Sequence, residues 1–363
     1  MQNEFQFFIT KIIHGVGSSK KVGDIAKKLG ARKALVMHGP NVKAAGIVDP
    51  CIEALKADGI TCIIYDKVEI ESPMHSIEEA AALGRAEGAD ICVAIGGGSC
   101  MDTAKVARML ITNPGTCRDY TTAIGTELYP NAGIPLICIP TTAGTGSEAT
   151  PNAIVAVPEE ELKVGIVNGS MVPDYVILDA MMIKNLPRKI AAATGIDAMA
   201  HAIECFTSNK ANPFSDMFAL QAFDLIMNNI ETACDDKEAL DAKNNMQIAA
   251  FYAGVAIACS GTTAVHALSY PLGGKYHIAH GVSNAILLVP VMKFNEPAIR
   301  GKLATAYDRV VHGEKTCTTE EAEKYQTYIL IHLGKQYHRL GIAMQIHYNC
   351  LRGVNRKMNS LLG

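Results

Sequence analysis

The 363-residue sequence has no tryptophan, and aromatic residues make up only 6% of it. Its net charge is −3 and its basic residues are scattered, which argues against a nucleic-acid or membrane-surface partner. No uninterrupted apolar run is long enough to span a bilayer. The eleven cysteines include no C-x-x-C pair, so we expect reduced thiols rather than disulfides. A basic-then-apolar signal peptide is also missing at the start, and these absences together predict a cytoplasmic protein.

Hydrophobic residues, by contrast, make up 49% of the chain, and its length favours two domains. The first half alternates short apolar runs with helical patterns, which predicts a parallel sheet covered on both faces. The second half carries helical periodicity with few strand signals. We therefore expect an α/β domain over residues 1–184 and a helical domain over 185–363, with the boundary near Lys184. The expected strands lie in 33–39, 61–66, 89–99 and 134–142, and the expected helices in 47–59, 76–88 and 101–111.

The run ADICVAIGGGS, residues 89–99, ends in three glycines and leads directly into a helical pattern. Glycines let the backbone approach a ligand closely, and the N–H groups of a first helical turn attract phosphate. The ordinary alternative is a capping box, for which Ser99 and Asp102 have the right spacing. Because the run is not the G-x-G-x-x-G fingerprint, it leaves both interpretations open.

A second glycine-rich turn, Pro140–Glu148, follows another apolar run. Two such loops at the carboxyl ends of neighbouring strands would form the crevice in which doubly wound folds bind nucleotides. An ordinary turn is the alternative, but the occurrence of both loops favours a dinucleotide. The hydroxyl groups of this turn belong to Thr141, Thr142, Thr145 and Ser147.

The helical segment TGIDAMAHAIE places Asp197 and His201 one turn apart, so both side chains project from one face. The pair is either a platform for a divalent metal or a plain hydrogen bond along the helix. Further on, His266, His277 and His280 fall within fifteen residues. Pro271 is expected to break the helix that contains His266, which would let His266 and His280 converge. One carboxylate and three histidines would then leave one coordination position of a bound metal for the substrate. The candidate ligands are Asp197, His201, His266 and His280, with His277 as a possible fifth donor or proton relay.

Four segments resemble the iron-containing (group III) alcohol dehydrogenase family in order and spacing. They are GGGSCMD, PTTAGTGSEAT, TGIDAMAHAIE and VHALSYPLGGKYHIAHGVSNAILLVP. The resemblance extends from about Ile9 to about Met344. It implies a Rossmann-like α/β dinucleotide-binding domain with a parallel sheet, followed by an all-α metal-binding domain. It also implies an NAD(P)-linked alcohol dehydrogenase for a small primary alcohol and its aldehyde, and a homo-oligomer, a dimer or larger.

The resemblance also implies roles for individual residues. It assigns a metal, Fe²⁺ with Zn²⁺ as an alternative, to Asp197, His201, His266 and His280. It assigns the pyrophosphate and nicotinamide side of the cofactor to Gly97, Gly98, Ser99 and Asp102. Thr141, Thr142, Thr145 and Lys163 are further implied contacts to the cofactor.

The sequence departs from the family at two places. Many relatives carry a histidine just before the proline of H-x-x-x-H-P-L-G, where this chain has Tyr270, so Tyr270 or His277 is expected to relay the proton. The tail HYNCLRGVNRKMNSLLG does not resemble the usual family ending.

The strand that contains Gly39 matches a family strand, and at the position of Gly39 NAD-preferring relatives often carry aspartate. Such a carboxylate bonds the ribose 2′-hydroxyl and repels a 2′-phosphate. Because this position is glycine, we expect NADPH to be used at least as well as NADH, with His38 or Lys43 able to assist. The alternative function is a carbon–oxygen lyase similar to dehydroquinate synthase. A highly charged, phosphate-bearing substrate would require a cluster of arginines and lysines around the metal helices. Apart from histidines, the segments Ile190–Phe206 and Gly261–Ala285 contain a single basic residue, Lys275.

Overall fold

The computed structural model describes residues 7, 10–121, 129–160, 162–276 and 278–311. The chain divides into two compact units, Met1–Val310 and Val311–Gly363. The first unit contains the described strands, and the predicted boundary near Lys184 lies inside it. His277 and the divergent tail lie outside the described residues.

Six parallel strands form one sheet in the first part of the chain. They are β1 (Lys11–His14), β2 (Lys33–Met37), β3 (Thr61–Tyr65), β4 (Ile91–Gly96), β5 (Leu136–Pro140) and β8 (Tyr175–Leu178). Their order across the sheet is β1-β8-β5-β4-β2-β3. The chain therefore winds outward from β2 to β3, crosses back to β4 and continues in the opposite direction. This reversal between β2 and β4 is where doubly wound sheets bind their ligands, outside the carboxyl ends of the strands.

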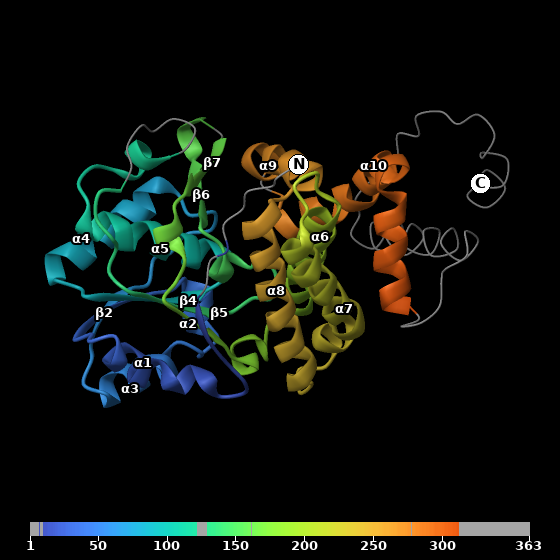
Figure 1. The fold of residues 1–363 in the computed structure, drawn as a ribbon. Helices are drawn as coiled ribbons and strands as arrows, with labels where there is room; N and C mark the ends of the chain where they lie inside the picture. Colours follow the sequence, from blue (N-terminus) through green and yellow to red (C-terminus); the bar gives the residue numbers. More distant parts are fainter. Residues whose placement is uncertain (1–6, 8–9, 122–128, 161, 277, 312–363) are drawn as a thin grey trace. The chain divides into compact units, whose positions relative to one another are not determined.

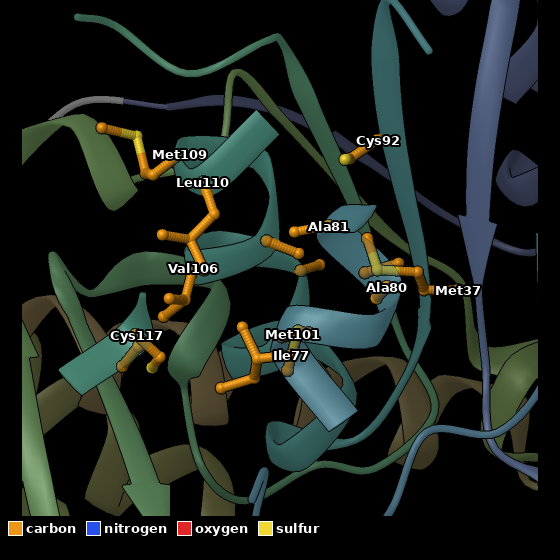
Figure 2. Close-up of a cluster of buried hydrophobic side chains, with 14 of the residues drawn as sticks. Met37, Ile77, Ala80, Ala81, Cys92, Met101, Val106, Met109, Leu110 and Cys117 are labelled. Atoms are coloured by element: carbon orange, nitrogen blue, oxygen red, sulfur yellow. The ribbon is translucent and has the colours of Figure 1, made fainter. Parts of the chain in front are cut away.

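Helices cover both faces of this sheet (Figure 1). They are α1 (Val22–Lys28), α2 (Pro40–Ala44), α3 (Asp49–Ala57), α4 (Met74–Glu87) and α5 (Gly98–Thr112). Along β4, Cys92 and Ala94 pack against α4 and α5, whereas Ile91, Val93 and Ile95 pack towards α1 and α3. Figure 2 shows the first of these clusters, with Ile77 of α4 beside Met101 of α5. Burial on both faces explains why the strands are continuously apolar rather than alternating.

A second, two-stranded sheet was not predicted from the sequence. Strands β6 (Asn152–Val157) and β7 (Leu162–Val167) pair antiparallel, and Val155 is buried in the same cluster as Val106 of α5. The sheet carries Lys163, which the sequence analysis had assigned to the cofactor without a structural element.

The second part of the described chain is helical, as expected. Its helices are α6 (Arg188–Thr207), α7 (Pro213–Asp235), α8 (Leu240–Ser260), α9 (Ala264–Tyr276) and α10 (His280–Val311). Local sequence fixes several ends. The Asn212 side chain accepts the backbone N–H groups of Phe214 and Ser215 to begin α7, with Pro213 at its first position. Gly261, with φ of 75°, ends α8.

Two close backbone approaches fix how these helices pack. A Cβ at Gly254 of α8 would collide with the carbonyl oxygen of Gly146, so the second glycine-rich turn packs directly on α8. A Cβ at Gly281 would likewise collide with the carbonyl oxygen of Ala193, which sets the start of α10 against α6. Glycine is required at both positions because no side chain fits between the backbones.

Within the described residues, no single helix is long and apolar enough to cross a membrane. Helices α8 and α9 reach the required length and hydropathy only as a pair bent by 107°. The nine described cysteines are free, and burial raises the pKa of most of their thiols, for example that of Cys92 to about 12.

Candidate active site

The two glycine-rich loops lie side by side at the carboxyl edge of the sheet, because β4 and β5 are neighbours and Gly96 is in register with Pro140. A Cβ at Gly97 would lie 3.2 Å from Oγ1 of Thr142, and one at Gly98 would lie 2.7 Å from Cγ2 of Thr145. The glycines thus keep the first turn of α5 close to the threonines of the other loop. This arrangement suits a ligand that contacts both loops at once.

Ser99 and Asp102 do not form the capping box that their spacing allowed. Helix α5 has Gly97 as its N-cap, without a side-chain cap. Asp102 instead accepts the hydroxyl of Ser147 at 2.5 Å and the backbone N–H of Ile154 at 3.0 Å. Asp102 therefore ties α5 to the second loop and to β6, and its burial raises the pKa of the carboxyl.

The loop before α4 adds residues to this edge that the sequence analysis missed. Glu71 and Ser72 have φ values of 70° and 52°, in the left-handed region that residues other than glycine seldom adopt. Ser99 holds this loop through the backbone N–H of Glu71 and the hydroxyl of Ser72, at 2.9 and 2.8 Å. The Glu71 carboxylate pairs with Lys163 at 2.6 Å. A Cβ at Gly273 of α9 would lie 2.8 Å from the same Lys163 ammonium, which places α9 beside the loops.

Gly39 follows β2 at the reversal point of the sheet and precedes α2. Its φ of −89° is ordinary, and a Cβ there would lie 3.3 Å from the carbonyl oxygen of Val68. Neighbouring His38 is only 1% exposed, and Lys43 pairs with Asp49. His38 is therefore covered, and Lys43 already forms an ion pair.

Four side chains from three helices converge in the helical part. Asp197 and His201 come from α6, His266 from α9 and His280 from the first turn of α10. Oδ1 of Asp197 lies 4.0, 3.5 and 3.6 Å from the Nε2 atoms of His201, His266 and His280. One ligand atom from each residue lies within 4.8 Å of all the others. Three imidazole nitrogens and one carboxylate oxygen at this spacing fit a divalent transition metal.

The helix break expected at Pro271 does not occur. Helix α9 continues through Pro271 to Tyr276, and the chain turns only before His280. Pro271 removes the hydrogen bond to the carbonyl of Ala267, but both residues are exposed, so water can replace the lost donor. The two histidines still converge, although α9 runs to Tyr276 and His280 is the first residue of α10.

The charges within this cluster affect each other strongly. Burial alone would raise the pKa of Asp197, but its three histidine neighbours outweigh burial and hold it below its usual value. Burial lowers the pKa of His201 to about 3. Burial also opposes protonation of His266, but Asp197 and Glu204 outweigh it and raise its pKa to about 9. A cation bound here therefore competes with a proton at His266.

Tyr270 lies beside the cluster on α9. Its ring stacks on that of His280, with centroids 6.0 Å apart and planes 14° apart. Burial raises the pKa of the Tyr270 hydroxyl, and the negative charges of Asp102 and Asp197 add to the effect. The pKa of Tyr270 is thus affected both by Asp102 of α5, beside the nucleotide loops, and by Asp197 of the cluster.

Family models match nearly the whole described chain. The model for iron-containing alcohol dehydrogenase matches residues 10–180, and the model for the C-terminal region of the Fe-containing alcohol dehydrogenase family matches residues 191–345. A Bacillus subtilis (strain 168) protein named choline dehydrogenase is 38% identical over 325 residues, 89% of this chain and 81% of that protein. The chain belongs to the iron-containing alcohol dehydrogenase family. It is a metal-dependent, NAD(P)-linked alcohol oxidoreductase.

Other relatives of the enzyme agree. A 1,3-propanediol dehydrogenase of Klebsiella pneumoniae is 34% identical over 294 residues, 80% of this chain and 75% of that protein. A crystal structure of 1,3-propanediol oxidoreductase superimposes with a TM-score of 0.85 at 32% identity, covering 94% of this chain and 88% of that one. These comparisons give the lyase alternative no support.

Two buried polar residues of the enzyme contact the cluster and were missed in the sequence. The Nδ2 atom of Asn284 lies 2.6 Å from Oδ1 of Asp197 and 3.0 Å from Nε2 of His266, while its Oδ1 has no partner among the described residues. Glu204, which is 0% exposed, contacts Nδ1 of His266. A signal for Glu204 was present, because a carboxylate in the apolar run HAIECF must be paired if it is buried.

Proposed function

We propose that the enzyme interconverts a small primary alcohol and its aldehyde at a metal held by the four-residue cluster. The observation that carries this proposal is the convergence of one carboxylate and three imidazoles within 4.8 Å, on helices adjoining the nucleotide loops. Asp197, His201, His266 and His280 are the proposed ligands. Fe²⁺ is the expected metal, and Zn²⁺ suits the same ligands.

The donor set explains why a metal is favoured over an internal ion network. Asp197 is 2% and His201 5% exposed, and the Nε2 atom of His201 lies 4.0 Å from Oδ1 of Asp197, too far for a hydrogen bond. The cluster therefore brings several polar atoms out of water without satisfying all of them, a cost that a bound cation offsets. When bound, the metal supplies Lewis acidity toward the substrate oxygen, and the nicotinamide exchanges the hydride.

We propose that residues 1–184 hold the dinucleotide and residues 185–363 hold the metal. The two glycine-rich loops support this division, because they bring backbone and hydroxyl groups to one edge of the sheet. NADPH is the proposed cofactor at least as readily as NADH, since Gly39 presents no carboxylate. The proposed cofactor contacts are Gly39, Gly97, Gly98, Ser99, Asp102, Thr141, Thr142, Thr145 and Lys163.

For the proton we propose Tyr270 or His277. The stacking of Tyr270 on His280 supports Tyr270, and His277 lies outside the described residues. Replacement of Tyr270 by Phe should lower kcat about tenfold or more and change its pH profile, while metal content stays normal. An unchanged pH profile would leave the role to His277.

Relatives named for choline, 1,3-propanediol and, in Bacillus methanolicus, methanol are dehydrogenases of different alcohols, so the substrate is open within this class. The deciding experiment combines metal analysis of freshly purified protein with NAD(P)H formation over a panel of short alcohols. We expect about one metal per chain and activity that chelation removes and Fe²⁺ restores. Absence of any cofactor reduction with metal-loaded protein would contradict the proposal. We also propose a cytoplasmic homo-oligomer, a dimer or larger, which light scattering would measure.

A further inference from the structure

Glu204 is buried on the same face of α6 as the proposed ligands Asp197 and His201. Its Oε1 atom accepts three hydrogen bonds from the start of α9, from Thr263 N at 3.1 Å, Thr263 Oγ1 at 2.6 Å and Val265 N at 2.8 Å. Its Oε2 atom contacts Nδ1 of His266. One carboxylate therefore both caps α9 and contacts the histidine two residues into that helix.

This contact has a consequence for the histidine ring. An ionised carboxylate only accepts hydrogen bonds, so Nδ1 of His266 must carry the proton. The lone pair of a neutral ring then lies on Nε2, which is the atom that faces Asp197 at 3.5 Å. Imidazole binds a metal through the nitrogen without a proton, and the partner of the other nitrogen decides which one that is.

Among the described residues, no carboxylate contacts the Nδ1 atom of either of the other two histidines. Nδ1 of His201 is buried and has no hydrogen-bond partner among the described residues. His280 is 32% exposed at its side chain, and within the described part of the chain its polar contacts involve Nε2. Of the three rings in the cluster, His266 is therefore the one that a charged partner fixes in both orientation and tautomer.

We propose that Glu204 is a positioning residue that holds His266 as the metal-binding tautomer and so sets the metal affinity of the site. The inference rests on the proposed function, because it requires His266 to be a ligand. Loss of a hydrogen-bond partner behind a metal-bound histidine commonly weakens metal binding by about 10–100-fold.

The substitution Glu204→Gln tests this role, and a control at Thr263 separates it from helix capping. Glutamine has one acceptor oxygen, whereas the site presents donors on both sides. If the oxygen stays with Thr263 and Val265, the amide N–H₂ faces Nδ1 of His266 and forces the proton onto Nε2. If the amide is rotated by half a turn, its N–H₂ group faces the donors of Thr263 and Val265 at the start of α9. Either arrangement disturbs the ligand or its support.

The experiment measures Co²⁺ binding to metal-free protein, by its visible absorption and by competition with a chelator, so no turnover is required. Glu204→Gln should bind Co²⁺ about 10–100-fold more weakly than the parent, with an altered absorption spectrum. Glu204→Asp keeps a carboxylate and should recover part of the affinity. Thr263→Val is the matched control, since it removes one partner of Glu204 without changing His266. It should lower the melting temperature of the metal-free protein but leave affinity within about threefold.

The outcomes separate the two proposals. His266→Ala must itself weaken Co²⁺ binding; if it does not, the proposed metal site is wrong. If His266→Ala weakens binding but Glu204→Gln binds as the parent does, the inference about Glu204 alone is wrong. Equal weakening in Glu204→Gln and Thr263→Val would show that Glu204 only supports α9 and would likewise overturn it. If Glu204→Gln does not fold, Glu204→Ala takes its place, and Co²⁺ affinity equal to the parent's in that variant overturns the inference.

Discussion

The nucleotide loops and the metal cluster are built in opposite ways. In the loops, the positions that matter most are glycines, and their geometry depends on how closely two backbone segments approach at one edge of the sheet. In the cluster, the ligand atoms belong to long side chains from α6, α9 and α10, and other buried side chains orient them. The first site should therefore be sensitive to added atoms and the second to removed atoms.

The largest effect is expected from a removal in the cluster. His266→Ala deletes one of four ligands, so metal content should fall and turnover should drop by about three orders of magnitude or more, since the metal supplies several kcal/mol of charge stabilisation. Leu268→Ala on the same helix, an exposed position, is the matched control and should behave as the parent does. Normal metal content with full activity in His266→Ala would contradict both the site and the comparison.

The next effect comes from an addition in the loops. Gly98→Val forces a side chain towards Thr145, whose Cγ2 atom would lie 2.7 Å from the new Cβ. Cofactor affinity, measured by fluorescence titration, should fall about 100-fold or more, because the backbone no longer approaches the pyrophosphate. Metal content should stay normal. Gly301→Val is the control, since a Cβ there meets no atom within 4 Å. Unchanged affinity would mean that the loop is only a turn before a helix.

A smaller effect tests the edge of the loop site. Gly39→Asp places a carboxylate where the adenosine ribose is expected, and Val68 must yield slightly because its carbonyl oxygen lies 3.3 Å from the new Cβ. The ratio of kcat/KM for NADPH and NADH should shift towards NADH by about tenfold, or about 1.4 kcal/mol. Gly39→Asn has the same shape without the charge and should shift it little. A parent that prefers NADH tenfold would refute the assignment of Gly39.

The last effect concerns stability of the loop rather than catalysis. Burial raises the pKa of Glu148 to about 7 from an ordinary 4.5, so the unfolded protein releases this proton at lower pH than the folded protein does. Stability should therefore fall as pH rises from about 4.5 to about 7, by about 3 kcal/mol of unfolding free energy, and then level off. Glu148→Gln should lack this loss, whereas the exposed Glu159→Gln should keep it. Parallel stability curves for the parent and Glu148→Gln would contradict the prediction.

The sequence was informative where one local cause determines the structure. Continuous apolar runs predicted β4 and β5, because burial on both faces leaves no polar position. The spacing of Asp197 and His201 predicted a shared helix face for the same kind of reason. The interpretation of Pro271 was wrong because proline removes one hydrogen bond, and an exposed carbonyl tolerates that loss. The β6–β7 sheet has no glycine-containing hairpin turn, and Glu71 meets Lys163 only through tertiary folding, so neither was predicted.

The strand order also has a consequence for the time at which the sheet is completed. Among the described strands, β1 pairs with β8 alone, and the backbone N–H groups of Gly17 and Ser19 bond to the carboxylate of Asp179. The ribosome makes β1 before the other described strands, yet its partner β8 follows more than 150 residues later, since Lys11 pairs with Tyr175. While β2, β3 and β4 are already able to pair, β1 must wait, and contacts so distant in sequence slow folding. Among the described strands, β1 is thus made before its neighbours and is among the last to join the sheet.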